Sequence, residues 1–144
     1  MINKNLRILI ADPQHFQRLN IERMLNQLGY FRIVPVQSFD ELDTLTHFSC
    51  NPFDLLIVSS TLVDALEIDL DAFCRDNPLI RHALIYDCQQ AQLLPMPQAL
   101  QVSLAGTPES QSLKSLMAIV DPPWQRHVLR VLPWLRELSR GRVG

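Results

Sequence analysis

The sequence has few glycines and cysteines and no long apolar run. Its four glycines, at positions 29, 106, 141 and 144, form no glycine-rich loop that could hold a phosphate. The three cysteines, Cys50, Cys74 and Cys88, are too scattered for a disulfide framework or a closely spaced zinc site, and we expect them to be small buried side chains. No stretch approaches the roughly 18 apolar residues of a membrane span, and the N-terminus lacks the apolar segment of a secretion signal. These absences favour a cytoplasmic protein.

Charge of either sign is also scarce, and it is unevenly distributed. Thirteen Lys and Arg against fifteen Asp and Glu give a formal net charge of −2, which provides no general attraction for nucleic acid. Residues 1–120 carry eight basic and thirteen acidic side chains, whereas residues 121–144 carry five arginines and two acids. The sequence therefore predicts a domain over residues 1–120 and a basic tail over residues 121–144.

Short apolar runs alternate with amphipathic segments along the predicted domain. Strand patterns occupy residues 7–11, 31–36, 54–58, 83–86 and 100–104. Helical patterns occupy residues 14–28, 38–48, 69–76 and 107–120, the last with an apolar stripe of Leu113, Leu116, Met117 and Val120. This alternation is typical of an α/β protein with a doubly wound, five-stranded parallel sheet and helices on both faces.

Local signals mark the ends of several elements. Gly29 follows the first helix, where glycine favours termination, and Ser38 with Glu41 forms a capping box for the second helix. One apolar face of that helix is predicted to hold Leu42, Leu45 and Phe48. Thr107-Pro108 predicts the cap and first residue of the last helix. Pro35 cannot donate a ladder hydrogen bond, so its strand must lie at an edge of the sheet or end there.

The segment 89–99 should contain a fourth helix, but it is rich in helix-breaking residues. Pro95 and Pro97 leave room for at most one or two helical turns before Pro95. We expect Leu93, Leu94 and Met96 to lie near the surface as candidate partner-binding residues. Two interpretations stay open, a changed partner surface and a shortened loop.

The strand pattern of residues 8–12, Ile-Leu-Ile-Ala-Asp, is followed by a helical pattern that ends in Leu-Gly-Tyr. With this first strand and helix, residues 5–120 resemble the receiver domain of two-component response regulators. Residues 54–63 resemble its third strand and the loop beyond, and Thr107-Pro108 stands where the family has Lys-Pro. The resemblance implies a flavodoxin-like sheet in the order 2-1-3-4-5, which puts the second strand and Pro35 at an edge.

The chemistry of that family is largely missing. The position of the phosphoacceptor aspartate holds Ser59, and the metal-binding acid pair is reduced to Asp12 because Pro13 follows it. The hydroxyl position corresponds to Asp87, and the lysine position to Thr107. One carboxylate seldom holds Mg²⁺ tightly, so we expect weak Mg²⁺ binding at most, no other cofactor, and no enzyme activity.

Asp12, Ser59, Asp87 and Thr107 should nevertheless converge at the carboxyl ends of the strands as a residual pocket. Two interpretations remain. The pocket could bind a cation or small ligand through the oxygens of Asp12 and Asp87. Alternatively, it could be filled by side chains and water, with Asp12 retained as a cap for the first helix.

The tail carries an apolar stripe and five arginines. We take Trp124, Val128, Leu132 and Leu135 as candidate partner-binding residues on a helix that Pro133 kinks or splits. The stripe must cover something: its own domain, a partner or second copy, or a membrane surface. The acidic segment 64–76 is either solvated surface or a docking patch for a basic partner or the tail.

These observations favour a response-regulator-like signalling protein that is not phosphorylated and acts as a protein–protein interaction module. Its partner would be another signalling protein or a second copy of the chain. The alternative is a receiver switch that senses Mg²⁺, a small ligand or a phosphoryl group through the residual pocket. His15 and His47 have no second ligand at metal-binding spacing, which favours surface or packing roles.

Overall fold

The structure is a computed structural model that describes residues 3–88, 92–96 and 99–122. This part of the chain contains six strands and four α-helices. In chain order they are β1 (Ile8–Ala11), α1 (His15–Gln27), β2 (Ile33–Val36), α2 (Phe39–Phe48), β3 (Phe53–Ser59), α3 (Leu70–Asp76), β4 (Ile80–Tyr86), β5 (Gln92–Met96), β6 (Ala99–Ser103) and α4 (Ser110–Val120), with a short 3₁₀ helix η1 (Ser60–Val63) after β3.

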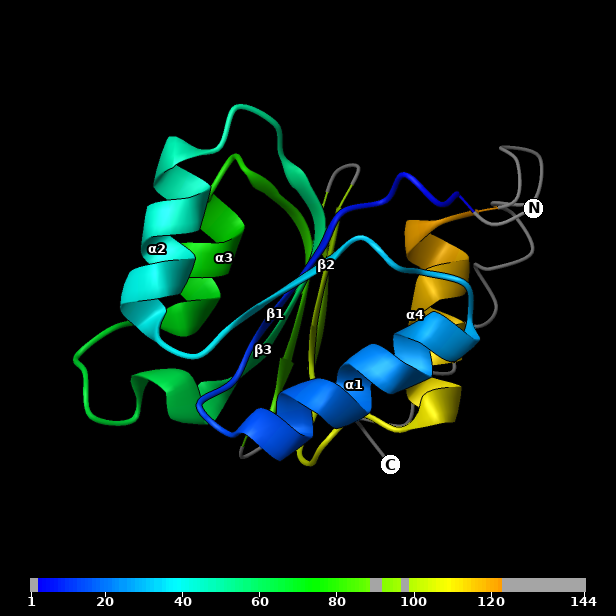
Figure 1. Ribbon diagram of the computed structural model, residues 1–144. Helices are drawn as coiled ribbons and strands as arrows, with labels where there is room; N and C mark the ends of the chain where they lie inside the picture. Colours follow the sequence, from blue (N-terminus) through cyan, green and yellow to red (C-terminus); the bar gives the residue numbers. More distant parts are fainter. Residues whose placement is uncertain (1–2, 89–91, 97–98, 123–144) are drawn as a thin grey trace.

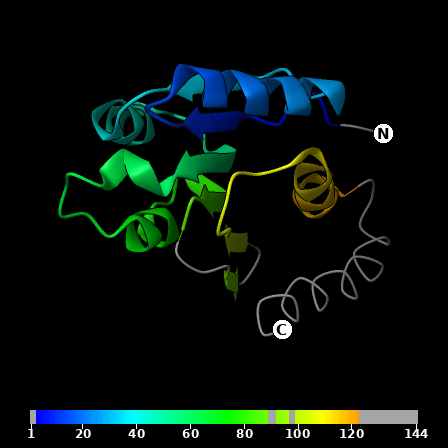
Figure 2. The ribbon, with the colours of Figure 1, turned by 90° about the horizontal axis from the view of Figure 1, so that it is seen from below.

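All six strands form one sheet in the order β2-β1-β3-β4-β6-β5. The first five strands of this order are parallel to one another, and β5 adds an antiparallel edge to β6. Helices α2 and α3 cover one face, and α1 and α4 cover the other (Figures 1 and 2). The predicted doubly wound α/β fold is therefore confirmed, with β6 as the fifth parallel strand.

The sheet is buried on both faces, as its continuous apolar runs predict. Alternate residues of β1 and β3 belong to two separate cores. Ile8, Leu55 and Ile57 pack with α1 and α4, whereas Leu9 and Leu56 pack with α2 and α3. At roughly 25 cal/mol per Å² of apolar surface removed from water, these two cores supply the main favourable contribution to folding.

Several local predictions are confirmed. Gly29 follows α1 with a positive φ of 103°, a conformation that costs glycine little. The Ser38 hydroxyl accepts a hydrogen bond from the Glu41 N–H at 3.2 Å and caps α2. Pro35 lies in β2 at one edge of the sheet, where its missing N–H leaves no ladder bond unmade. The stripe along α4 is buried.

The predicted helical turn before Pro95 is wrong, because residues 92–96 form strand β5. Pro95 lies opposite Leu100 of β6 in the antiparallel ladder. A proline prevents a helix from continuing through it but is tolerated on an edge strand, and β5 is the outermost strand. The structure therefore extends the sheet at the position where we expected a helix.

Three smaller predictions also fail. Helix α4 begins at Ser110 after an extended Glu109, so Thr107 is not its cap and Pro108 is not its first residue. Phe48, predicted to share the apolar face of α2, is 76% exposed at the last residue of that helix. Of the three cysteines expected to be buried, Cys74 is buried and Cys88 half-buried, but Cys50 is exposed. Each position lies at or just beyond the end of an element, where local patterns predict least well.

No helix among the described residues has the length and apolar character needed to cross a membrane.

Candidate functional site

The predicted pocket residues lie at the carboxyl ends of the parallel strands. Ala11 is level with Val58, so Asp12 follows β1 beside the last residue of β3, Ser59. Ser59 is in turn level with Tyr86 at the end of β4. Because side chains alternate along strands, these three residues project toward the face covered by α1 and α4, in line with Ile10, Ile57 and Leu84.

The Asp12 carboxylate is buried and has a donor on each oxygen. The Tyr86 hydroxyl donates to Oδ2, and the Gln14 N–H donates to Oδ1 at 2.8 Å. Asp12 is only 2% exposed, so these donors replace the water that the carboxylate gives up on folding. Asp12 does not cap α1 itself, because the N-cap is Gln14. Instead, it forms a turn just before the helix.

The Tyr86 side chain fills this region and stays protonated. It is fully buried, and burial is the largest cause of the raised pKa of its hydroxyl, followed by the hydrogen bond to Asp12. Arg18 contributes a third contact from α1, since its Nη1 donates to the Asp12 carbonyl oxygen at 2.6 Å. The phenol is thus a permanent donor to Asp12 at neutral pH.

The Ser59 hydroxyl is held by the start of the following 3₁₀ helix. Its Oγ lies 2.7 Å from Thr61 Oγ1 and accepts the Thr61 N–H at 3.2 Å. A longer contact of 3.5 Å joins it to Asp87 Oδ2. None of these partners is a histidine, and the basic group among them is the Asp87 carboxylate at this long distance. Ser59 caps η1 in this arrangement.

Asp87 and Thr107 are the solvent-facing part of the cluster. Asp87 is exposed and has a positive φ of 59°, a conformation that aspartate tolerates better than most residues. Its N–H donates to the Gly106 carbonyl oxygen at 3.1 Å, and its own carbonyl oxygen accepts from the Ser60 hydroxyl at 2.6 Å. Thr107 is exposed and follows Gly106, the residue whose carbonyl oxygen makes this backbone contact with Asp87.

The structure therefore brings together Asp12, Ser59 and Asp87, and it adds Tyr86, which the sequence analysis missed as a site residue. Strand parity could have identified it, because Tyr86 is the last residue of a buried strand and shares a face with Leu84. The expected role of the cluster as a pocket stays a prediction. Across the described residues, no three His, Cys, Asp or Glu side chains are grouped to hold a metal ion.

The predicted partner-binding residues are only partly described. Leu93, Leu94 and Met96 belong to β5, which places their backbone at the outer edge of the sheet. The tail residues Trp124, Val128, Leu132 and Leu135 lie outside the described residues.

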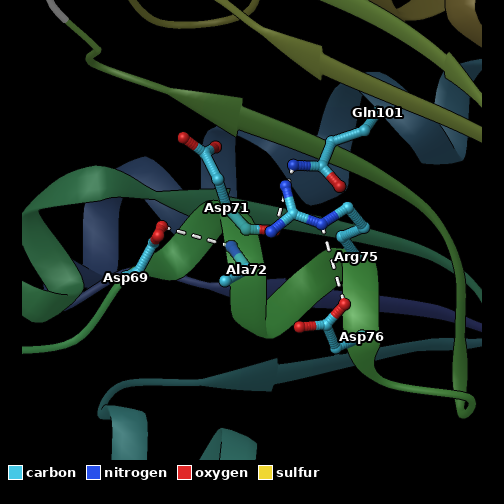
Figure 3. A network of polar contacts seen from close by, with 6 residues as sticks. All are labelled: Asp69, Asp71, Ala72, Arg75, Asp76 and Gln101. Carbon is cyan, nitrogen blue, oxygen red and sulfur yellow. Dashed lines mark hydrogen bonds and ion pairs between the residues drawn. The ribbon is translucent and has the colours of Figure 1, made fainter.

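In the acidic segment 64–76, several polar groups cap α3 or bind it to the sheet (Figure 3). Asp69 caps the helix by accepting the Ala72 N–H at 3.2 Å, and Asp76 lies 3.6 Å from the Arg75 Nε in an exposed ion pair. The buried Gln101 of β6 donates to the Asp71 carbonyl oxygen at 3.2 Å. Helix capping and attachment to β6 thus account for part of this polar surface.

A shallow groove of about 530 Å³ lies between α2 and α3 beside this network. Asp43, Asp69 and Asp76 line it together with His47. The groove is the place where the predicted acidic docking patch would lie.

The fold and the strand-end cluster together define a doubly wound α/β protein with an Asp–Tyr pair where such sheets commonly bind ligands. No family model matches the chain, and neither the curated proteins nor the solved structures include a match.

Proposed function

We propose that this protein is a response-regulator-like signalling module that binds another protein and is not switched by phosphorylation. It acts in the cytoplasm, where the free thiols of Cys50, Cys74 and Cys88 stay reduced. The five parallel strands in receiver order and the strand-end position of Asp12, Ser59 and Asp87 support the relation to receivers.

The bond between Tyr86 and Asp12 carries the proposal. A receiver needs its strand-end carboxylates free to hold Mg²⁺, whereas both oxygens of Asp12 already accept hydrogen bonds. At the acceptor position, Ser59 would form an ordinary phosphate ester instead of an acyl phosphate. An incoming phosphoryl group would also meet Asp87, whose Oδ2 is 3.5 Å from the serine oxygen. Two unit charges about 4 Å apart repel by about 4 kcal/mol at an effective dielectric constant of 20.

The interaction surface is the edge of the sheet formed by β5. In chain order the antiparallel strand β5 stands between β4 and β6, where receivers have their fourth helix, and in the sheet it lies beyond β6 at the edge. An outermost strand presents backbone donors and acceptors to a partner strand, and β5 does so except at Pro95, which has no N–H. A partner that pairs with β5 would thus bind a surface that does not depend on the strand-end cluster.

One observation favours the alternative, a switch that senses a cation or small ligand. Asp87 is exposed and takes a left-handed conformation, and such conformations cluster at functional sites. In that case Asp87 would provide the first ligand oxygen.

The test is an amide ¹H–¹⁵N spectrum of the full chain with and without Mg²⁺ and beryllofluoride, a phosphoryl mimic. We expect no shifts at Ser59, Thr61 or Asp87 and no gain in intact mass after incubation with acetyl phosphate. Shifts centred on these residues that disappear in Asp87→Asn would support the switch. A phosphorylated chain would refute the proposal.

The interaction role is tested separately with a photo-crosslinking residue at position 94 in β5. A matched control carries the same residue at Arg23, which is exposed on α1 at the other end of the sheet. We expect a discrete crosslinked adduct with the partner protein from position 94 only, and we expect Asp12→Asn to leave this adduct unchanged. Equal or absent crosslinking at both positions would argue against the β5 edge as the interaction surface.

A further inference from the structure

An apolar groove of about 180 Å³ lies between the sheet and α4, and it is partly open to solvent. Its floor comes from three elements, with Leu84 of β4, Val102 of β6 and Leu116 of α4. Leu104, just after β6, is half-buried at its side. An engineered apolar cavity of about 150 Å³ accepts a benzene-sized group, so this groove has room for apolar side chains.

The groove exists because the sheet is wider than the helices that cover it. On this face the described helices are α1 and α4, and β6 and β5 extend the sheet past α4 (Figure 2). The side of α4 that borders the groove carries two small side chains, Ser112 and Ser115. Both are half-buried, so they leave the apolar floor accessible from the side.

The chain that follows α4 has the composition to fill this groove. Beyond Val120, residues 121–144 carry an apolar stripe that includes Trp124, Val128, Leu132 and Leu135. With five arginines and two acids, residues 121–144 carry a net charge of +3, which is opposite in sign to the net charge of −5 on residues 1–120 as a whole.

The length of the connection fits as well. Ser112 lies eight residues before Val120, which is about 12 Å along α4 at 1.5 Å per residue. A helix that turns back after the Pro122-Pro123 pair and runs antiparallel to α4 would cover that distance in about eight residues. Leu132 would then be level with Ser112.

We propose that residues 124–132 of the chain, which precede Pro133, dock as a helix in this groove, antiparallel to α4, and complete the cover of the β6 and β5 side of the sheet. The apolar stripe of the tail packs on Leu84, Val102 and Leu104. This inference goes beyond the proposed function, because it assigns the tail to its own domain and leaves the strand edge of β5 for a partner.

The chain contains its own probe for a test. Its only two tryptophans, Trp124 and Trp134, are both in the tail, so tryptophan fluorescence reports the tail alone. Acrylamide quenching of the full chain is compared with that of Ser115→Arg, which puts a long charged side chain in the groove. The control is Ser110→Arg, the same substitution at an exposed residue of α4 that does not line the groove.

We expect weak quenching in the parent chain and in Ser110→Arg, and a several-fold stronger quenching with a red-shifted emission in Ser115→Arg. If acrylamide quenches the parent chain as strongly as the chain unfolded in urea, the proposal is overturned. It is also overturned if the tryptophans of Ser110→Arg and Ser115→Arg are equally protected from quenching. If protection of the tryptophans from quenching falls on dilution, and light scattering gives the mass of a dimer, the apolar stripe of the tail packs on a second copy of the chain. This result would also overturn the proposal.

A second variant covers the case in which Ser115→Arg does not fold. Leu132→Glu changes only the tail, and the amide signals of Leu104, Ser112 and Ser115 are followed in the full chain. If the tail docks in the groove, Leu132→Glu should shift these three amide signals and leave the amide signals of α2 unchanged. Unmoved signals at all three residues would refute docking, and this result would leave the phosphodonor test unaffected.

Discussion

The Tyr86–Asp12 hydrogen bond joins the ends of two strands that β3 separates, and its removal should be costly. Tyr86→Phe keeps the ring and deletes only the hydroxyl, so it opens no large cavity. The Asp12 Oδ2, in a side chain that is 2% exposed, then loses its donor in a place that water scarcely reaches. Hydrogen bonds to charged groups contribute about 1.5–3 kcal/mol, and we expect the free energy of unfolding to fall by that amount.

The chain offers a matched control in its other tyrosine. Tyr30 also donates to an aspartate, Asp121, at 2.7 Å. That carboxylate is only half-buried and also accepts the Asn3 N–H at 3.0 Å, so it keeps a donor and access to water in Tyr30→Phe. We therefore expect a smaller loss for this variant, about 1 kcal/mol or less.

Urea unfolding at neutral pH, followed by circular dichroism, measures both losses. A double-mutant cycle with Asp12→Asn isolates the coupling between Tyr86 and Asp12, which should be about 1.5 kcal/mol or more. If Tyr86→Phe costs no more than Tyr30→Phe, or the coupling is below about 0.5 kcal/mol, the pair does not hold the strand ends together. The explanation of the cluster as a structural element would then be wrong.

Two further predictions concern buried polar groups. Burial, with a smaller contribution from a neighbouring arginine, lowers the pKa of His82 to about 4, so only the unfolded chain takes up the proton between pH 6.5 and 4. The free energy of unfolding should fall by about 3 kcal/mol as the pH drops through this window. If the urea midpoints of the parent chain and of His82→Gln change with pH in the same way, this prediction is wrong. Ser59→Asp puts a buried carboxylate at the position where the serine hydroxyl of the parent chain lies 3.5 Å from Asp87 Oδ2. The repulsion should destabilise the fold by several kcal/mol without creating a phosphoacceptor. Adding Asp87→Asn should restore part of that loss, and an undiminished loss in thermal unfolding would count against charge repulsion as its cause.

The strand-end cluster was only half predictable from the sequence. Asp12 and Ser59 could be identified because each directly follows or ends a buried apolar run, and parallel strands end at one edge of the sheet. The pairing of Asp12 with Tyr86 could not, because it joins residues 74 positions apart across an intervening strand. Only the tertiary arrangement shows that the carboxylate has its donors already in place.

The same division holds for the whole protein. Residues near in sequence determined the parallel strands, the edge position of Pro35, the turn at Gly29 and the buried stripe of α4, because each depends on local periodicity, on a proline's missing donor or on glycine's backbone freedom. Tertiary structure decided the conformation of residues 92–96. Pro95 only prevented a helix from continuing through the segment. Pairing with β6 made it a strand, and that pairing exists only once the sheet has formed. Tertiary structure also decided where α4 leaves its groove, because this depends on how far the sheet extends past the helix.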